Sequence, residues 1–250
     1  MWHVSERVGK RPYMEDRHLV IPDFHLGYTL MAVFDGHGGS EVAMHCARRF
    51  PQVLKDHMDT FGVFDMRTIL IKSFRAVHDS LHESTPEFCG STALVVLKHK
   101  NHLWVANCGD SRAILNVHDR VRSLSQDHKP GDVREKRRIE ALGGAVIAVQ
   151  GVPRVSGELA VSRSIGDKRY HPFVTSEPEV SYYPIAPLNK FIVVATDGLW
   201  DVMSNSDVNR WVWNVLVEQQ SCAKAADSLL QYAYDSRDAE DNITAIVYVL

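Results

Sequence analysis

Two long apolar runs most constrain what this chain can fold into. One extends from Tyr28 to Phe34 and the other from Lys190 to Thr196, and each carries apolar residues at consecutive positions. Successive side chains of a β-strand point to opposite faces, so strands of this kind need apolar partners on both faces. We therefore expect a sheet that packs against a second sheet on one side and against helices on the other.

The order of the expected elements along the chain predicts the same architecture. A helical period begins at Ser40, which we expect to cap the helix, and it ends near Asp59. Further helices are expected near 66–83, 132–142, 206–218 and 222–234, and further strands within 1–35 and near 91–97, 103–107, 112–116, 145–149, 179–183 and 242–250. Helix pairs between groups of sequential strands predict an α+β fold: a central sandwich of two antiparallel β-sheets flanked by helix pairs, in four layers (α/β/β/α).

The composition suits one large globular domain, which we expect to extend over residues 1–250. Hydrophobic residues make up 45% of the chain, and no repeat or low-complexity tract interrupts it. The net charge of −3, from 31 acidic and 28 basic residues, argues against a general nucleic-acid-binding protein. The longest apolar runs are too short to span a bilayer.

The cysteines bear on the compartment. Cys46, Cys89, Cys108 and Cys222 are widely spaced and form no C-x-x-C pair, which excludes a zinc ribbon. We expect four buried, reduced thiols. The first residues also lack the basic and then apolar leader of a secreted protein. Both features favour a cytoplasmic or nuclear location.

Acidic residues recur beside glycine or at the ends of expected strands. The most informative are Asp35 and Asp197, because each follows one of the long apolar runs and precedes a glycine. The others are Glu15, Asp16, Asp110, Asp201 and Asp241. A single aspartate beside a glycine is ordinary turn chemistry. If the strands pack together, however, their carboxylates gather at one edge of the core.

Carboxylates gathered at that edge would repel one another unless their charge were compensated. Divalent cations are the natural compensation, and oxygen ligands without histidine or cysteine favour magnesium or manganese over zinc. Glu15 and Asp16 are adjacent, so on a regular strand they point to opposite faces and only one is a direct ligand of a given ion. Gly36 either forms a tight turn or leaves its own carbonyl open to a metal ion.

Other hydrolytic chemistries lack their signatures. A cysteine nucleophile at Cys46 would need an arginine six residues later, and that position is Gln52. The Gly-x-Ser-x-Gly elbow of acyl transfer is absent. The Gly-Asn-His-Glu metal motif of the other serine/threonine phosphatase superfamily is absent as well. The route through carboxylates and metal ions remains.

A series of short blocks, in order along nearly the whole chain, closely resembles the type 2C metal-dependent protein phosphatases. The blocks are Arg11–Asp16, Phe34–Gly39, Gly90–Ala93, Cys108–Arg112, Asp127–Pro130, Glu140–Gly144, Leu159–Asp167, Thr196–Val202 and Asp241–Thr244. Any one block is a weak signal, whereas the ordered set is specific to that family. The family's fold is the four-layer sandwich already expected from the order of the elements.

The resemblance implies a centre of two magnesium or manganese ions. It implies that Asp35 bridges the two ions. Glu15 and the carbonyl of Gly36 would complete one site, and Asp197 and Asp241 would complete the other.

Three further acidic residues take weaker roles in the same resemblance. Asp16 would hold metal-bound water. Asp110 and Asp201 match positions that are linked, in some family members, to a weaker third ion.

The resemblance also implies the groups that handle the substrate. Arg11 matches the family's phosphate-binding arginine, and its planar fork suits a phosphate. His37 matches the proposed general acid, and an ordinary histidine titrates near pH ~6.5, which suits that role. Arg154 resembles an arginine near the substrate groove. For Arg11 and His37 the alternatives are a solvated strand-edge arginine and a turn histidine.

The implied function is the dephosphorylation of phosphoserine and phosphothreonine in signalling proteins. Water activated by the two ions would attack the phosphorus, without a covalent phosphoenzyme. The expected partners are phosphoprotein substrates, and we expect a monomer. One alternative is a catalytically weak pseudophosphatase that acts as a scaffold, although none of the expected ligands is missing. Another is a two-metal nuclease or phosphodiesterase, against which the lack of a strongly basic composition counts.

Overall fold

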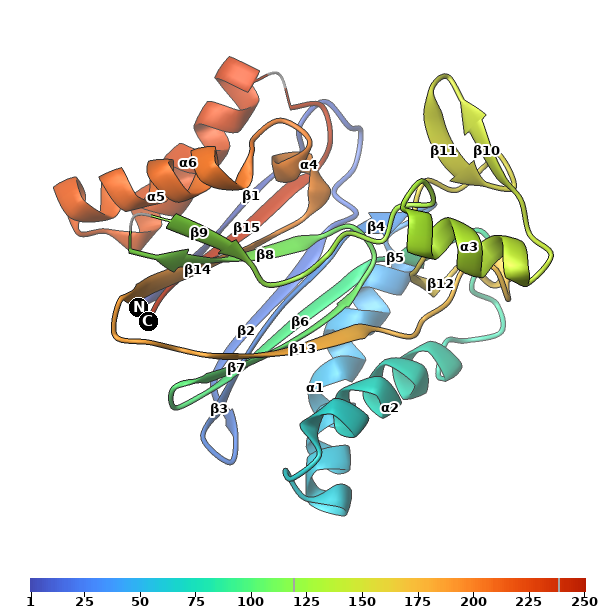
Figure 1. The fold of residues 1–250 in the computed structure, drawn as a ribbon, viewed down its shortest axis with the longest axis horizontal. Coiled ribbons are helices and arrows are strands. Elements are labelled where there is room, and N and C mark those ends of the chain that lie inside the picture. The colour runs from blue at the N-terminus through green and yellow to red at the C-terminus, as the bar shows by residue number, and fades with distance from the viewer. Residues whose placement is uncertain (119, 238) are drawn as a thin grey trace.

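The computed structural model describes residues 1–118, 120–237 and 239–250, and its centre is a pair of five-stranded antiparallel sheets (Figure 1). The first sheet has the order β1 (Trp2–Arg7), β15 (Ile243–Val249), β14 (Asn189–Ala195), β8 (Arg112–Val117) and β9 (Arg120–Ser123). The second has the order β13 (Glu179–Pro184), β7 (His102–Cys108), β6 (Ala93–His99), β3 (Tyr28–Phe34) and β2 (Arg17–His25). The two longest apolar runs of the sequence are thus β3 and β14, one in each sheet.

Each sheet carries a helix pair on its outer face (Figure 1). Helices α1 (Glu41–Phe61) and α2 (Met66–Asp79) pack on the second sheet, and α5 (Asn205–Gln219) and α6 (Cys222–Arg237) pack on the first. The predicted α+β fold with four layers is confirmed.

Strand β3 shows why an apolar residue is needed at consecutive positions. Leu30 and Phe34 face the helices, while Met31 and Val33 belong to the core between the two sheets. All four side chains are fully buried. Alternate side chains of the strand therefore enter two different apolar layers, one beneath the helices and one between the sheets.

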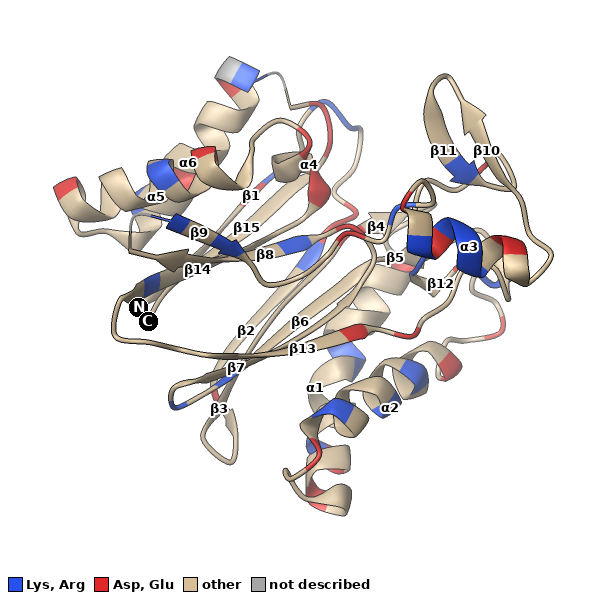
Figure 2. Ribbon diagram, in the orientation of Figure 1, with Lys and Arg blue, Asp and Glu red and all other residues tan. Residues whose placement is uncertain are grey.

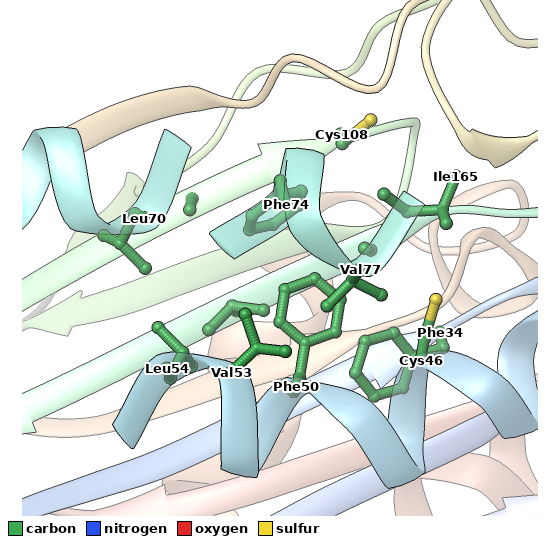
Figure 3. Close-up of a cluster of buried hydrophobic side chains, with 14 of the residues drawn as sticks. Phe34, Cys46, Phe50, Val53, Leu54, Leu70, Phe74, Val77, Cys108 and Ile165 are labelled. Atoms are coloured by element: carbon green, nitrogen blue, oxygen red, sulfur yellow. The ribbon is translucent and has the colours of Figure 1, made fainter. Parts of the chain in front are cut away.

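Aromatic rings hold the helix pair α1 and α2 against its sheet (Figure 3). The ring centroid of Phe50 on α1 lies 5.5 Å from that of Phe34 on β3 and 4.9 Å from that of Phe74 on α2. Removal of a buried phenylalanine side chain of this kind costs about 3–5 kcal/mol of stability.

Smaller elements lie around the sandwich. A three-stranded sheet has the order β12 (Ile165–Gly166), β5 (Gly90–Ser91) and β4 (Gly36–His37), and a separate hairpin is formed by β10 (Val146–Val149) and β11 (Val152–Val155). Helix α3 (Val133–Ala141) precedes that hairpin, a 3-10 turn covers Lys168–Tyr170, and α4 (Asp197–Trp200) directly follows β14. Of these elements only α3 and β10 were expected from the sequence.

Two expectations about helix ends were wrong. Helix α2 ends at Asp79 rather than near Glu83, because the following residues form tight turns that still bring Leu81 into the buried cluster. Ser40 stands at the start of α1 but makes no side-chain cap, since its own backbone is helical (φ −88°, ψ −2°). By contrast, the side chain of Asp132 accepts the backbone N–H groups of Arg134 and Glu135 at the start of α3.

All four cysteines are buried free thiols, as expected. In the part of the chain that the structure describes, no helix is long and apolar enough to cross a membrane.

Candidate active site

The expected acidic residues lie on loops at one end of the sandwich. Asp35 follows β3, Asp110 follows β7, and Asp197 opens α4 at the end of β14. Asp241 lies just before β15, and Glu15 lies just before β2. Figure 2 shows acidic positions on the segments between α4 and β4. Strands far apart in sequence therefore bring their carboxylates to a common edge.

A cavity of about 470 Å³ opens at this edge. Of the predicted site residues, those that line it are Arg11, Glu15, Asp35, Gly36, His37, Asp110, Arg154, Asp197 and Asp241. Asp16 and Asp201 do not line it. A larger cavity of about 680 Å³ lies between β9 and α5, and its described lining includes none of the predicted residues. The smaller cavity is therefore the candidate site.

Asp35 and Asp197 both line the cavity wall. Their carboxyl groups are close enough that the charge of Asp197 disfavours ionisation of Asp35. Burial and the charge of Asp197 raise the pKa of Asp35 well above its ordinary value. Burial and the charges of Asp110 and Asp201 raise the pKa of Asp197 in the same way. The pair thus lies where negative charge is unfavourable without a counter-ion.

Asp16 lies beneath the cavity floor rather than in it. Its Oδ2 accepts hydrogen bonds from the hydroxyl groups of Thr196, at 2.9 Å, and Thr244, at 2.8 Å. Its Oδ1 is buried and has no partner in the described part of the chain. Burial, opposed by the two threonine hydrogen bonds, raises the pKa of Asp16 to about 7. Glu15 lines the cavity and Asp16 is buried, and both belong to an irregular loop and not to a strand.

Asp241 is engaged by Arg11. The Nη2 atom of Arg11 lies 2.7 Å from Oδ2 of Asp241, and both side chains are partly exposed. The neighbouring residue, Asn242, fixes the loop that carries Glu15. The Oδ1 of Asn242 accepts the backbone N–H of Glu15 at 2.8 Å, and its Nδ2 donates to the carbonyl of Tyr13 at 3.0 Å.

Asp110 and Asp201 share a lysine. The Nζ of Lys129 lies 3.2 Å from Oδ2 of Asp110 and 3.7 Å from Oδ1 of Asp201. Burial raises the pKa of Asp110, although Lys129 opposes this shift. Burial opposes the ionisation of Lys129, but the charges of Asp110, Asp201 and Asp197 raise its pKa above the ordinary value.

The carboxylates at this edge are suitable ligands for divalent cations in their donor atoms, although their side chains are not arranged as a preformed metal site. Among the described residues, no three histidine, cysteine or acidic side chains stand grouped as metal ligands. Two of the carboxylates have basic partners instead: Asp241 pairs with Arg11, and Asp110 lies beside Lys129. The donors are nevertheless all oxygens, and the raised pKa values of Asp16, Asp35 and Asp197 show negative charge that lacks compensation. Magnesium or manganese would supply that compensation.

Gly36 is required for close packing rather than for a turn. A Cβ atom at this position would lie 2.6 Å from the carbonyl oxygen of Glu15. Glycine therefore lets the segment after β3 approach the loop that carries Glu15, which brings two of the expected ligands together.

His37 has a partner that was not foreseen. Its Nε2 lies 2.7 Å from Oδ2 of Asp167, whose side chain is fully buried. The hydroxyl of Ser164 donates to the same carboxylate oxygen. Burial disfavours the imidazolium, but the hydrogen bond and the charge of Asp167 raise the pKa of His37 above its ordinary value.

The segment that carries Asp167 is anchored to α3 by a buried ionic network. Glu135 is 3% exposed, and its carboxylate accepts from Arg163 at 2.6 Å and from Arg138 at 2.9 Å. The Ser162 hydroxyl donates to it at 2.9 Å. Burial opposes ionisation, but the two arginines lower the pKa of Glu135 to about 2.

Arg154 lies on β11 and lines the cavity. Its Nη1 donates to the carbonyl of Glu158 at 2.7 Å. The hairpin of β10 and β11 therefore contributes one basic group to the wall of the site.

Comparison with known proteins identifies the family. The family model described as Protein phosphatase 2C matches residues 3–243. The chain belongs to the protein phosphatase 2C family. It is similar to "Protein phosphatase 2C 50" of Oryza sativa subsp. japonica, with 38% identity over 317 aligned positions that include 99% of this chain and 81% of the relative. It is also similar to "Protein phosphatase 2C 77" of Arabidopsis thaliana, with 37% identity over 83% of this chain and 56% of the relative.

Two solved structures share the fold. A structure described as a serine-threonine phosphatase 2C from Toxoplasma gondii superposes with a TM-score of 0.88 at 23% identity, over 100% of this chain and 94% of that one. A structure described as a C. elegans sex determining protein gives a TM-score of 0.93 at 25% identity, over 100% of this chain and 64% of that one. The chain thus spans between about half and nearly all of the length of the proteins it matches.

Sequence reasoning missed three functional candidates of this protein phosphatase 2C site: Asn242, Lys129 and Asp167. Each stands in one of the blocks that carry the resemblance, so each could have been singled out. Their partners could not, because the bonds join residues between 19 and 229 positions apart.

Proposed function

We propose that this chain is a magnesium- or manganese-dependent protein serine/threonine phosphatase. It would hydrolyse phosphoserine and phosphothreonine in proteins with water as the nucleophile and without a covalent phosphoenzyme. The observation that carries the proposal is the Asp35–Asp197 pair. The raised pKa values of both carboxyl groups indicate that negative charge in this cavity is unfavourable without a counter-ion, and bound cations would supply that counter-charge. The chain also belongs to a family of protein phosphatases.

The residues that would hold the two ions come from four loops. Asp35 would lie between the ions, Glu15 and the carbonyl of Gly36 would complete one site, and Asp197 and Asp241 would complete the other. These five residues all line the same cavity.

Such a pair of ions would lower the pKa of a water molecule and balance the charge of a bound phosphate. Asp16 lies behind this set, and its buried Oδ1, which has no partner among the described residues, would accept a hydrogen bond from a metal-bound water.

Arg11 would bind the phosphate of the substrate. Its guanidinium already lies at the cavity wall, and its ion pair with Asp241 is partly exposed. Exposed ion pairs of this kind contribute only about 0–1 kcal/mol to stability. Separation of Arg11 from Asp241 would therefore cost little free energy. If Asp241 held a cation, the fork of Arg11 would be free to bind phosphate oxygens.

His37 would protonate the leaving serine or threonine oxygen. Asp167 holds Nε2 of its ring, so Nδ1 is the nitrogen left to donate a proton. Arg154, which also lines the cavity, would contact residues that flank the phosphorylated position.

We also propose that residues 1–250 form one catalytic domain that acts as a monomer on phosphoproteins in the cytoplasm or nucleus. A nuclease or phosphodiesterase would need a basic surface for its substrate, whereas the cavity lining has five acidic residues and two arginines.

Hydrolysis of a phosphothreonine peptide tests the proposed function. We expect turnover with Mn²⁺, none with EDTA, and none in Asp197→Asn, which removes a ligand. Asp79→Asn is the matched control, because Asp79 is an exposed aspartate at the end of α2. Near-normal Mn²⁺-dependent turnover by Asp197→Asn would remove it from the centre. A folded wild type with no turnover would instead favour a scaffold of the same fold.

A further inference from the structure

The position expected for a third ion is bordered by an ammonium group. Asp110 and Asp201 were expected to share a weaker ion, and Lys129 lies between them, at 3.2 Å from one carboxylate and 3.7 Å from the other. The side chain of Asp110 is 5% exposed, that of Lys129 is 45% exposed and that of Asp201 is 62% exposed. The lysine therefore reaches the pair from the solvent side.

The backbone fixes this lysine beside Asp110. The N–H of His128 donates to the carbonyl of Gly109 at 2.9 Å, and the N–H of Gly109 donates to the buried His128 ring at 3.2 Å. The carbonyl of Lys129 accepts the N–H of Asp132, the residue that caps α3. The loop after β7 and the segment before α3 are thus joined on both sides of the contact.

The position between Asp110 and Asp201 suits the ammonium group of Lys129 better than a divalent metal ion. A divalent ion in contact with both carboxylates would lie only a few ångströms from the ammonium of Lys129. At that separation two positive charges repel strongly unless water screens them. The carboxylate of Asp110 is almost excluded from water, so the screening on its side is poor.

We propose that the ammonium of Lys129 takes the place of a third divalent ion between Asp110 and Asp201, and so limits the centre to two ions. The lysine is a cation-selecting residue in this account: its single positive charge offsets one of the two carboxylate charges, and it excludes further Mg²⁺ or Mn²⁺. The inference rests on the proposed two-ion centre but makes a separate statement about the number of ions.

Mn²⁺ binding to the intact chain tests the inference without any reaction. The variant is Lys129→Met, which removes the charge and keeps the length of the side chain. Bound Mn²⁺ is counted from the loss of the free-ion EPR signal and, independently, by calorimetric titration. We expect two ions for the wild type and three for the variant, with the third site at least about tenfold tighter than any third site of the wild type.

The controls separate a local effect from a general change of charge. Lys55→Met is matched, because Lys55 is 46% exposed and lies 2.7 Å from a carboxylate oxygen of Asp59 on α1, away from the cavity. It should bind as the wild type does. The double variant Lys129→Met with Asp201→Asn should lose the third ion again. Lys129→Gln is measured in parallel, and thermal unfolding checks the fold of each variant.

Each outcome decides the inference. A third ion in Lys129→Met that disappears in the double variant supports it. Equal numbers and affinities in wild type and Lys129→Met overturn it, and so does a wild type that already binds three ions as tightly as the variant. A folded wild type that binds no Mn²⁺ overturns the two-ion centre itself, which is a different result from a wild type that binds two.

Discussion

The Nε2 atom of His37 lies 2.7 Å from Oδ2 of Asp167, a carboxylate whose side chain is fully buried. These residues are 130 positions apart, and they meet because β4 and β12 both pair with β5. The hydrogen bond fixes the orientation of the imidazole and leaves Nδ1 as its free nitrogen. Asp167 is thus a positioning residue for the proposed proton donor.

The first prediction concerns Asp167→Asn. We expect kcat on a phosphothreonine peptide to fall by about 10- to 100-fold, below the 10²–10⁴ that general acid catalysis typically supplies. An activated aryl phosphate should lose much less, because its leaving group needs little protonation. Steady-state kinetics on both substrates, with His37→Gln and the double variant, measure the effect. Equal losses on both substrates, or additive losses in the double variant, would contradict the positioning role.

The second prediction concerns Gly90, which lies on β5 beside this pair. A Cβ atom here would lie 2.1 Å from Oδ2 of Asp167 and 2.5 Å from Nε2 of His37. Gly90→Ala should therefore separate the pair and reproduce the substrate-dependent loss of Asp167→Asn. Gly143→Ala is the control, because a Cβ there meets nothing within 4 Å but the backbone has a φ of +86°. It should cost about 1 kcal/mol of stability and leave kcat unchanged.

The third prediction separates stability from metal binding. Asp35 and Asp197 repel each other when no cation is present, so Asp197→Asn should raise the Tm of the protein in EDTA by a few degrees. Each kcal/mol corresponds to about 2–4 °C for a chain of this size. With saturating Mn²⁺ the order should reverse, because only the wild type keeps the ligand. Calorimetric melting in both buffers measures this, and a lower Tm for the variant in EDTA would argue against uncompensated charge.

The fourth prediction is a pH dependence of stability at Glu135. The folded pKa of Glu135 is lowered to about 2, below the ~4.3 of an unfolded glutamate, so its stabilising contribution is full above pH ~4.3 and is lost as the pH falls toward 2. Glu135→Gln should cost about 3 kcal/mol at pH 7, and the difference should shrink between pH 5 and pH 2. Urea unfolding at several pH values measures it.

A matched control lies on the same helix. Glu140 is 51% exposed and lies 3.8 Å from Lys136, so Glu140→Gln should cost less than about 1 kcal/mol. A difference for Glu135→Gln that stays constant from pH 7 to pH 2 would show that the buried network is not the source of its stability.

Much of the fold could be predicted from the sequence, because the strands and helices that form the four layers are long enough to show a period. The consecutive apolar residues of β3 and β14 predicted a strand buried on both faces, and Leu30 and Met31 confirm it by entering different cores. The strands β4, β5 and β12 have two residues each and could not show any period. The expected helix near 66–83 included Leu81 because this residue continues the helical spacing of apolar residues, but it lies beyond the end of α2 and is buried with that helix.

The site could be predicted as a set of residues but not as a set of contacts. Adjacent positions and flanking glycines singled out the acidic residues, and the cavity does gather Glu15, Asp35, Asp110, Asp197 and Asp241. The sequence does not show which carboxylate meets which partner, since that depends on how distant loops pack. The contact of Lys129 with Asp110 and that of Asp167 with His37 are of this kind.

Phosphate release from a phosphothreonine peptide during a titration with Mn²⁺, by the wild type and by Asp35→Asn, tests the central claim most directly. We predict that wild-type turnover rises with Mn²⁺, disappears with EDTA and returns with excess Mn²⁺, while Asp35→Asn shows none at any concentration. Wild-type turnover that EDTA leaves unchanged, or wild-type rates in a folded Asp35→Asn variant, would contradict the account.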